Sequence, residues 1–565
     1  MEPERRAAVR RHRTSAAVFA GYLALAFAYF GVRVAAHPER THVGGLFTDP
    51  QIFVWSFAWW PHALLHGENP FYTHAIWAPD GFNLAWATSV PGLAVAFAPL
   101  TLAFGPVLAY DAACVVMPAL AAWAAYLLCR ELTGRTWPSL AGGYLFGFSS
   151  YVLGGELTHL HTVAVFPAPL LALAVLRFVR GGLSGLGLAV RAGVLLALEA
   201  YCSTELLFTL TAALAAALVQ ALALVPAARR RLVASLAPLA GAYALAALLA
   251  APLLYYVATG YVSGLTQDAP SFSADLLNLV VPTRASLGGW WSDGVAGRFP
   301  ANDVERGAYL GVPALAIVLS FGLRARRSPG ARFLLAGLAL AVLAALGSWV
   351  TVDGRRVATL PWSRLATLPL WKDVMPVRFM LYASLALAVA VALWAASDLR
   401  PAWVRPALAA LAVVFVAPDV SWHAWARRPD VPSLFTTGEY RSCLSRGENV
   451  LAFPVGARGD SLVWQAEAGF WFRFAGGYVS QRVPDGFLHP KGVARVATSD
   501  NPFEVTLRDV LALARRKGVT AAVVSARASD PWRSVLAPLG PPERAGGALV
   551  YRLPGAGARR CGASG

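Results

Sequence analysis

The sequence predicts a polytopic α-helical membrane protein, with about 11 transmembrane helices and a small C-terminal α/β domain. The 565 residues are 57% hydrophobic and only 14% charged, which is more apolar surface than one soluble core can hide. Apolar stretches recur along the chain to about residue 419, where the composition becomes mixed polar and apolar. We therefore expect a transmembrane module over 1–420 and a soluble domain over 421–565.

A membrane-crossing helix needs roughly 20 apolar residues. The stretches that reach or approach this length are 15–36, 106–129, 137–151, 162–179, 187–204, 206–226, 232–258, 308–323, 333–351, 377–397 and 405–419. The first is longer than the core of a signal peptide, so we expect an uncleaved span. The short stretches 137–151 and 405–419 need tilted neighbours or a few interfacial residues to cross.

The arginines indicate the orientation. Basic residues outnumber acidic ones 48 to 31, and many lie in alternate connections between the spans. These are Arg130 and Arg135; Arg177, Arg180 and Arg191; Arg229 to Arg231; Arg324, Arg326, Arg327 and Arg332; and Arg400 and Arg405. The positive-inside rule places them and the basic N-terminus in the cytoplasm, and the odd number of spans sends the C-terminal domain outside. No soluble segment carries a basic stripe with interleaved aromatic residues, which argues against nucleic-acid binding.

The Ala- and Arg-rich composition is typical of a bacterial genome of high GC content, so we expect the bacterial inner membrane. One apolar stretch, 89–105, is left out of the count. Treating it as a span would move every later arginine cluster outside, so we interpret it as a helix lying in or dipping into the outer face.

The first outer loop, about 37–105, carries the leading candidate for catalysis. Asp49 follows the first span within the run 45–51, and an aromatic stretch from Phe53 to Trp60 comes next. Trp55 and Trp59 share a helical face, which predicts an interfacial helix, since Trp favours the headgroup layer. Asp49 before Pro50 is also the pattern of a helix start, and the two roles are compatible. Asp80 before Gly81 favours a turn.

The second outer loop, 149–161, places one carboxylate and two imidazoles within six residues: Glu156, His159 and His161. This set can bind a divalent metal ion, or hold a diphosphate or an acceptor hydroxyl by hydrogen bonds. Two histidines two residues apart are not a specific metal motif, so ordinary loop polarity is an equal alternative.

Further ionisable residues are expected near the same membrane face. The acids are Asp111, Glu199 and Glu205, and their clustering argues for a shared outward-facing site because charge is costly inside a membrane. Arg378 departs from the positive-inside pattern, and its planar fork suits a lipid phosphate. Snorkelling to ordinary headgroups is the alternative. Arg284 and Arg298, in the loop 259–307 with Trp290 and Trp291, are weaker candidates.

The C-terminal segment reads as a small α/β domain. We predict buried strands at 449–454 and 521–525, an amphipathic helix over 506–517 and a closing strand over 548–553. Cys443 and Cys561 can pair as a disulfide if the segment lies outside the cytoplasm. The chain has no Walker A sequence, no Gly-x-Ser-x-Gly elbow and no His-Glu-x-x-His motif.

Over residues 15–400 these features resemble the GT-C superfamily of integral membrane glycosyltransferases. The resemblance rests on Asp49 soon after the first span, on the cytoplasmic turn 129–135, and on the polar motif after the third span. It implies that Asp49 acts as a base or orients the acceptor. The second motif is often Asp-x-Asp or Asp-x-Glu in the superfamily, whereas only Glu156 is acidic here, so metal dependence stays open.

The resemblance further implies a hexosyl- or pentosyltransferase that uses a polyprenyl-phosphate sugar and a lipid, glycan or protein acceptor. The reaction would be a direct displacement with inversion at the sugar, in which Asp49 takes the acceptor proton and Arg378 offsets charge on the lipid phosphate. Two alternatives stay open. A transporter or flippase would place ionisable groups near the midplane and show internal repeats, and a noncatalytic envelope scaffold would use Asp49 only to cap a helix.

Overall fold

The computed structural model describes residues 2–45, 49–262, 268–398, 401–456, 459–499, 501–527, 530–554 and 561–562, with side chains from residue 13 onward. Leu46, Phe47 and Thr48 of the run before Asp49, and Arg400 of the last basic cluster, lie outside the described residues. The chain divides into two compact units. Unit 1 comprises Met1–Ala36, Ala112–Ala251 and Asp268–Ala426, and unit 2 comprises His37–Asp111, Pro252–Gln267 and Arg427–Gly565.

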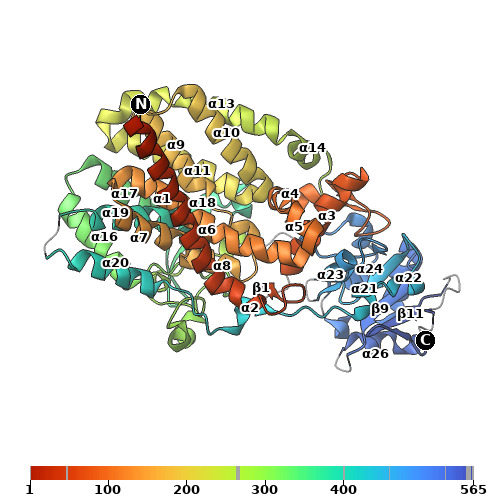
Figure 1. Cartoon of the computed structure of the whole chain (residues 1–565). Helices are drawn as coiled ribbons and strands as arrows, with labels where there is room; N and C mark the ends of the chain where they lie inside the picture. The colour runs from red at the N-terminus through yellow and green to blue at the C-terminus, as the bar shows by residue number, and fades with distance from the viewer. Residues whose placement is uncertain are drawn as a thin grey trace. The chain divides into compact units, whose positions relative to one another are not determined.

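Unit 1 is built from helices (Figure 1). The longer ones are α1 (Glu2–Ala26), α6 (Pro106–Thr133, which begins in unit 2), α7 (Thr136–Gly147), α9 (Pro167–Val179), α10 (Gly185–Cys202), α11 (Thr204–Leu224), α13 (Leu236–Leu249), α16 (Val312–Ala325), α17 (Pro329–Ala345), α19 (Met380–Ala395) and α20 (Val404–Phe415). Shorter elements are α2 (Val32–Val34), α8 (Ser150–Glu156), α12 (Arg229–Ala234), α14 (Ala251–Thr259, continuing into unit 2), α15 (Asp293–Ala296), α18 (Trp362–Leu365) and the hairpin of β4 (Trp349–Val352) with β5 (Arg355–Thr359).

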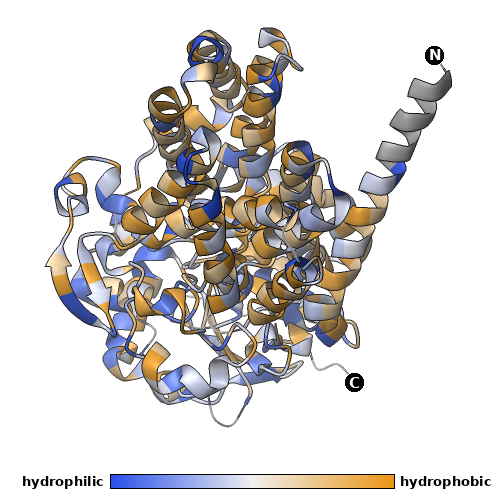
Figure 2. Ribbon diagram, turned by 90° about the vertical axis from the view of Figure 1, so that its left-hand side faces the viewer, coloured by the Kyte–Doolittle hydropathy of each residue, from blue (hydrophilic) through white to orange (hydrophobic). Residues whose placement is uncertain are grey.

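Apolar packing holds these helices together, and hydrophobic residues dominate their ribbons in Figure 2. One core lies where α9, α10, α11 and α13 meet, and it includes the buried Leu171, Phe178, Leu196 and Leu239. A second joins α6, α9 and α19 around Leu128, Leu173 and Val389. Between membrane-spanning helices such packing stabilises through van der Waals contacts, each worth only about 0.1–0.2 kcal/mol per atom pair but numerous for every buried side chain.

Among the described residues, six helical segments are long and apolar enough to cross a membrane, or seven if a bent pair counts as one span. They are Arg13–Val34, Pro106–Thr133, Leu160–Val179, Gly185–Cys202, Thr204–Leu224 and Pro376–Ala395, with the bent pair Pro226–Ala234 and Leu236–Leu249. Three of the other predicted spans correspond to shorter apolar helices, α16, α17 and α20, and a fourth to α7. The count of eleven spans stays a prediction.

The omitted stretch 89–105 forms two short helices, α4 (Pro91–Ala96) and α5 (Ala98–Phe104). At 1.5 Å per residue, each rises only about 10 Å, which is far short of a bilayer core of about 30 Å. Neither helix can therefore cross by itself.

Unit 2 contains a five-stranded mixed sheet with strand order β10-β11-β9-β7-β8 (Figure 1). Its strands are β7 (Asn449–Ala452), β8 (Arg473–Phe474), β9 (Ala521–Ser525), β10 (Glu543–Ala545) and β11 (Ala548–Arg552). The helices α21 (Ser433–Thr436), α22 (Tyr440–Cys443), α23 (Ser461–Glu467), α24 (Lys491–Thr498), α25 (Leu507–Lys517) and α26 (Trp532–Leu536) accompany it. β7 runs parallel to β8 and β9, whereas β11 is antiparallel to β9 and β10.

The predicted C-terminal elements are confirmed. Strands lie at Asn449–Ala452, Ala521–Ser525 and Ala548–Arg552, and the amphipathic helix is Leu507–Lys517. A capping box between Thr506 and Asp509 starts this helix.

The first loop packs with this sheet in unit 2. It forms β1 (His42–Val43), α3 (Pro50–His66), β2 (Tyr72–Thr73) and β3 (Phe82–Asn83). Phe474 N–H donates to the carbonyl of Ala75 at 2.7 Å, and Ala78 N–H donates to the carbonyl of Phe474 at 3.0 Å, which adds an extended segment beside β8. The loop and the C-terminal segment therefore belong to one compact unit, and a functional boundary at residue 420 stays a prediction.

Helix α3 corrects the expected interfacial helix. Trp55 and Trp59 do share a face, with rings stacked 5.6 Å apart. However, both are buried inside unit 2, where each ring contacts the edge of Phe470 and the Trp55 indole donates to Gln465 at 2.8 Å. These aromatic side chains fill a protein core because the C-terminal segment supplies their partners.

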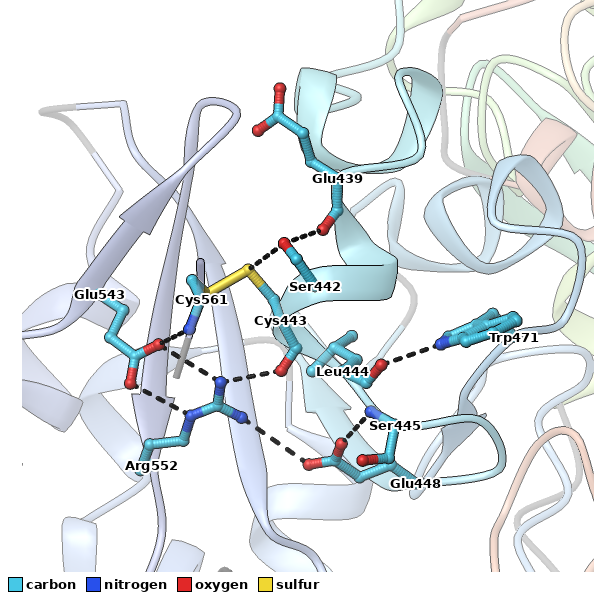
Figure 3. Close-up of a disulfide and its surroundings, with 10 residues drawn as sticks. All are labelled: Glu439, Ser442, Cys443, Leu444, Ser445, Glu448, Trp471, Glu543, Arg552 and Cys561. Carbon is cyan, nitrogen blue, oxygen red and sulfur yellow. Dashed lines mark hydrogen bonds and ion pairs between the residues drawn. A yellow bond between two sulfur atoms is a disulfide. The ribbon is translucent and has the colours of Figure 1, made fainter. Parts of the chain in front are cut away.

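A disulfide between Cys443 and Cys561 closes the C-terminal segment, as the sequence suggested (Figure 3). Beside it, Arg552 donates to the carbonyl of Cys443 at 2.8 Å and pairs with Glu543 at 3.3 Å. Glu543 also accepts the Cys561 N–H at 2.6 Å. Cys561 is thus fixed covalently to α22 and by a hydrogen bond to Glu543 of β10.

Candidate functional site

A buried ion pair forms the centre of the site in unit 1. Arg378 lies on a 3-10 turn, Pro376–Phe379, that leads into α19. Its Nη1 donates to Glu305 Oε2 at 2.6 Å and its Nη2 donates to Glu305 Oε1 at 2.8 Å. Only 4% of the Arg378 side chain and 2% of the Glu305 side chain are exposed. This bidentate geometry is the strongest arrangement available to an arginine and a carboxylate.

Two further groups reach the pair. His159 Nδ1 lies 2.9 Å from Glu305 Oε1, and Glu205 Oε2 lies 3.5 Å from Arg378 Nε. Glu205 also accepts the N–H of Met375 at 3.3 Å. The His159 and Glu205 side chains are 16% and 23% exposed, so solvent reaches the cluster from their side. Four chain segments therefore converge on one charged centre.

Close backbone approach explains why Glu305 lies here. A Cβ on Gly154 would stand 2.2 Å from the carbonyl oxygen of Val304, and one on Gly307 would stand 2.9 Å from the Cα of Tyr151. Both distances are too short for any side chain, so glycine lets α8 and the segment around Glu305 touch. This contact places Glu305 between His159 and Arg378.

Charge pairing controls the protonation of Glu305. Burial alone would raise the pKa of this carboxyl, but the Arg378 charge and the interaction with His159 outweigh it and lower the pKa to about 2. Glu305 is therefore ionised throughout the physiological range.

The predicted Glu156 is buried at the end of α8, with 1% of its surface exposed. Neither carboxyl oxygen has a hydrogen-bond partner of normal geometry in the part of unit 1 that is described, although the Cys114 thiol lies close enough to influence it. Burial raises the pKa of this carboxyl well above its usual range, which favours the neutral acid. His161 lies beside His159, with ring centres 5.6 Å apart.

The other two predicted acids are also buried. Glu199 lies in α10 with 2% of its surface exposed, and its Oε1 has no hydrogen-bond partner among the described residues. Asp111 lies in unit 2, where it accepts the N–H of Val43 at 2.7 Å. That bond anchors the start of the first loop.

Asp49 precedes α3 as predicted, with Pro50 as the first helical residue. Its side chain makes no capping hydrogen bond to the described part of this helix. It is half-buried and belongs to unit 2.

Three further candidates are engaged in ion pairs. Asp80 lies in a turn, as expected, and its carboxylate pairs with Lys517 at 2.5 Å. Arg284 pairs with Asp293, and Arg298 pairs with Asp353 at 2.6 Å. Each of the three therefore has a charged partner, and a role in the site stays a prediction for Asp80 and Arg284.

Glu305 was not among the residues predicted from the sequence. The Asn302 side chain accepts the N–H of Glu305 at 3.1 Å and forms a turn in the irregular segment before α16. A usable signal was present, because an arginine at membrane depth requires a counter-charge. Within the described residues, no group of three or more His, Cys, Asp or Glu side chains is arranged to hold a metal ion.

A family profile described as "Domain of unknown function (DUF6311)" matches residues 18–419. The chain belongs to the DUF6311 family. The DUF6311 region contains the Arg378–Glu305 pair, His159 and Asp49, and it ends before the C-terminal sheet. No curated protein matches the chain significantly.

Solved structures identify the fold. The arabinofuranosyltransferase AftD from Mycobacteria matches 97% of this chain at 16% identity, with a TM-score of 0.56, and this chain spans 40% of its length. The oligosaccharyltransferase AglB from Archaeoglobus fulgidus, solved with an inhibitory peptide and a dolichol-phosphate, matches 91% of this chain at 14% identity, with a TM-score of 0.50, and 70% of AglB is covered. The DUF6311 chain is a multi-pass membrane protein with the GT-C fold, and the resemblance predicted from its sequence is confirmed.

Proposed function

We propose that this chain is a membrane glycosyltransferase that moves a sugar from a polyprenyl-phosphate donor to an acceptor outside the cytoplasm. The observation that supports this most directly is the likeness to AftD over 97% of the chain. A fold carries many functions, so the buried charged cluster around Arg378 adds independent support.

In the proposed reaction an acceptor hydroxyl attacks the anomeric carbon directly. Asp49 takes the hydroxyl proton as a general base while the new carbon–oxygen bond forms. The bond between the anomeric carbon and the phosphate oxygen breaks, and its electron pair leaves with the lipid phosphate, whose charge Arg378 offsets. One displacement inverts the anomeric centre. Glu156, His159 and His161 are proposed to hold donor or acceptor groups.

We further propose that the protein lies in the bacterial inner membrane, with its N-terminus in the cytoplasm. The Cys443–Cys561 disulfide supports an extracytoplasmic position for the C-terminal segment, since disulfides persist in oxidising compartments. The sugar, and whether the acceptor is a lipid, a glycan or a protein, are left to the experiment.

The test uses the purified full-length protein in lipid, radiolabelled polyprenyl-phosphate sugars and membrane extract. Asp49→Asn keeps the side-chain shape and removes the base, so we expect correct folding and loss of transfer. Asp398→Asn is the matched control because its side chain is 92% exposed and outside the proposed machinery. Undiminished transfer by Asp49→Asn would reject the base, and no transfer by wild type from a complete donor panel would favour a transporter or scaffold.

A further inference from the structure

Glu305 occupies the atoms with which Arg378 would bind a phosphate. Both terminal nitrogens of the guanidinium already donate to Glu305, at 2.6 and 2.8 Å. These two nitrogens form one of the parallel-donor edges that recognise carboxylates and phosphates alike. Along this edge, a carboxylate of the same chain takes the place of a ligand anion.

The charges beside the pair oppose an incoming anion. Glu205 Oε2 lies 3.5 Å from Arg378 Nε, so two carboxylates face a single guanidinium. A phosphate that approached from the exposed side of Glu205 and His159 would meet negative charge at both edges of Arg378. Strong phosphate binding at Arg378 therefore requires one carboxylate to withdraw.

The local structure shows which carboxylate can withdraw. Arg378 is held on a helical turn that continues into α19, whereas Glu305 lies in the irregular segment between α15, which ends at Ala296, and α16, which starts at Val312. A loop side chain can adjust at lower cost than a residue in a helix. His159, 2.9 Å from Glu305 Oε1, offers a second partner that would remain with the displaced carboxylate.

We propose that Glu305 is an internal competitor for the lipid phosphate: it pairs with Arg378 when no donor is present, and the donor phosphate replaces it there. This inference rests on the proposed function and adds a regulatory contact to the same site. The exchange forms and breaks only ionic hydrogen bonds. It keeps Arg378 neutralised before the donor arrives and makes donor binding depend on the release of Glu305.

The experiment measures binding and does not require transfer. A short polyprenyl phosphate is titrated into the purified full-length protein in detergent, with the matching polyprenol as the uncharged control ligand. Glu305→Gln keeps the shape and removes the competing charge, so we expect at least tenfold tighter phosphate binding and unchanged polyprenol binding. Arg378→Lys keeps the charge but loses the fork, and we expect at least tenfold weaker phosphate binding.

Glu305→Asp is the second variant, because it keeps the charge and the fold but is too short to reach both terminal nitrogens. It should also bind the phosphate more tightly than wild type, and it decides the matter if Glu305→Gln does not fold. Equal or weaker phosphate binding by the folded variants would overturn the competition. Transfer is assayed separately, so the two proposals can fail independently. If the Glu305 variants bind the phosphate more tightly but wild type transfers no sugar, the proposed function is rejected and the competition between Glu305 and the phosphate stands.

Discussion

The Arg378–Glu305 pair gives a quantitative prediction about stability. Replacing Arg378 by Met leaves the Glu305 carboxylate buried without its main partner, a change that typically costs 3–5 kcal/mol. The Glu305 pKa gives an independent figure, because a fall from 4.5 to about 2 corresponds to about 3 kcal/mol of stabilisation. The double variant Arg378→Met with Glu305→Gln should cost clearly less than the sum of the single changes.

The three cysteines outside the disulfide provide a local assay. Cys114, Cys129 and Cys202 are all buried and all lie in unit 1, so a thiol-reactive dye reports the unfolding of that unit on heating. A loss of 3–5 kcal/mol should lower the midpoint by roughly 6–10 °C. A shift of the thermal midpoint by less than about 2 °C in Arg378→Met would refute this prediction. So would a double variant whose loss of stability equals the sum of the losses in the two single variants.

The same assay has a defined pH dependence. A depressed carboxyl pKa contributes stability above about pH 4.5, and that contribution is lost as the pH falls toward 2. Wild type should therefore lose this stabilisation only below about pH 4.5. As the pH falls, the stability penalty of Arg378→Met should begin to shrink already above pH 4.5. The reason is that the unpaired, buried Glu305 of this variant takes up a proton at a higher pH than the paired one does.

Three further results are expected. Replacing Cys443 and Cys561 by Ser opens a link across 118 residues and should destabilise unit 2 by about 3–5 kcal/mol, measured by pulse proteolysis of the full-length protein. Lys517→Met removes the partner of Asp80 and should cost about 1–2 kcal/mol in the same assay. Glu156→Gln should raise the thermal midpoint of unit 1 at pH 7, because the folded acid holds a proton that the unfolded chain releases above about pH 4.5; a midpoint that falls would contradict this.

The sequence predicted those features that have a local pattern. Short apolar runs marked the strands predicted at 449–454 and 521–525, and the amphipathic pattern over 506–517 marked a helix. The aromatic pattern of α3 predicted a helix with one Trp face, but the same residues suit a headgroup layer and a protein core. Only the folded chain shows which environment applies.

The features that sequence could not reveal depend on distant partners. Nothing near residue 305 indicates that its carboxylate meets an arginine 73 positions later, and neither Ala75 nor Phe474 signals that their backbones pair. Arg378 was recognised as out of place, but its position alone did not distinguish a free ligand site from a satisfied ion pair. Long-range pairing leaves no periodicity along the chain, and for that reason Glu305 was missed while Arg378, His159 and Glu205 were found.

The bond from Trp55 to Gln465 joins residues 410 positions apart. A ribosome that adds about 5–20 residues per second needs roughly 20–80 seconds to cover that distance. Throughout this interval the tryptophans of α3 have been synthesised but their C-terminal partners do not yet exist. A prematurely terminated product would keep that aromatic face exposed permanently, which makes the completion of synthesis a condition for burying the beginning of the chain.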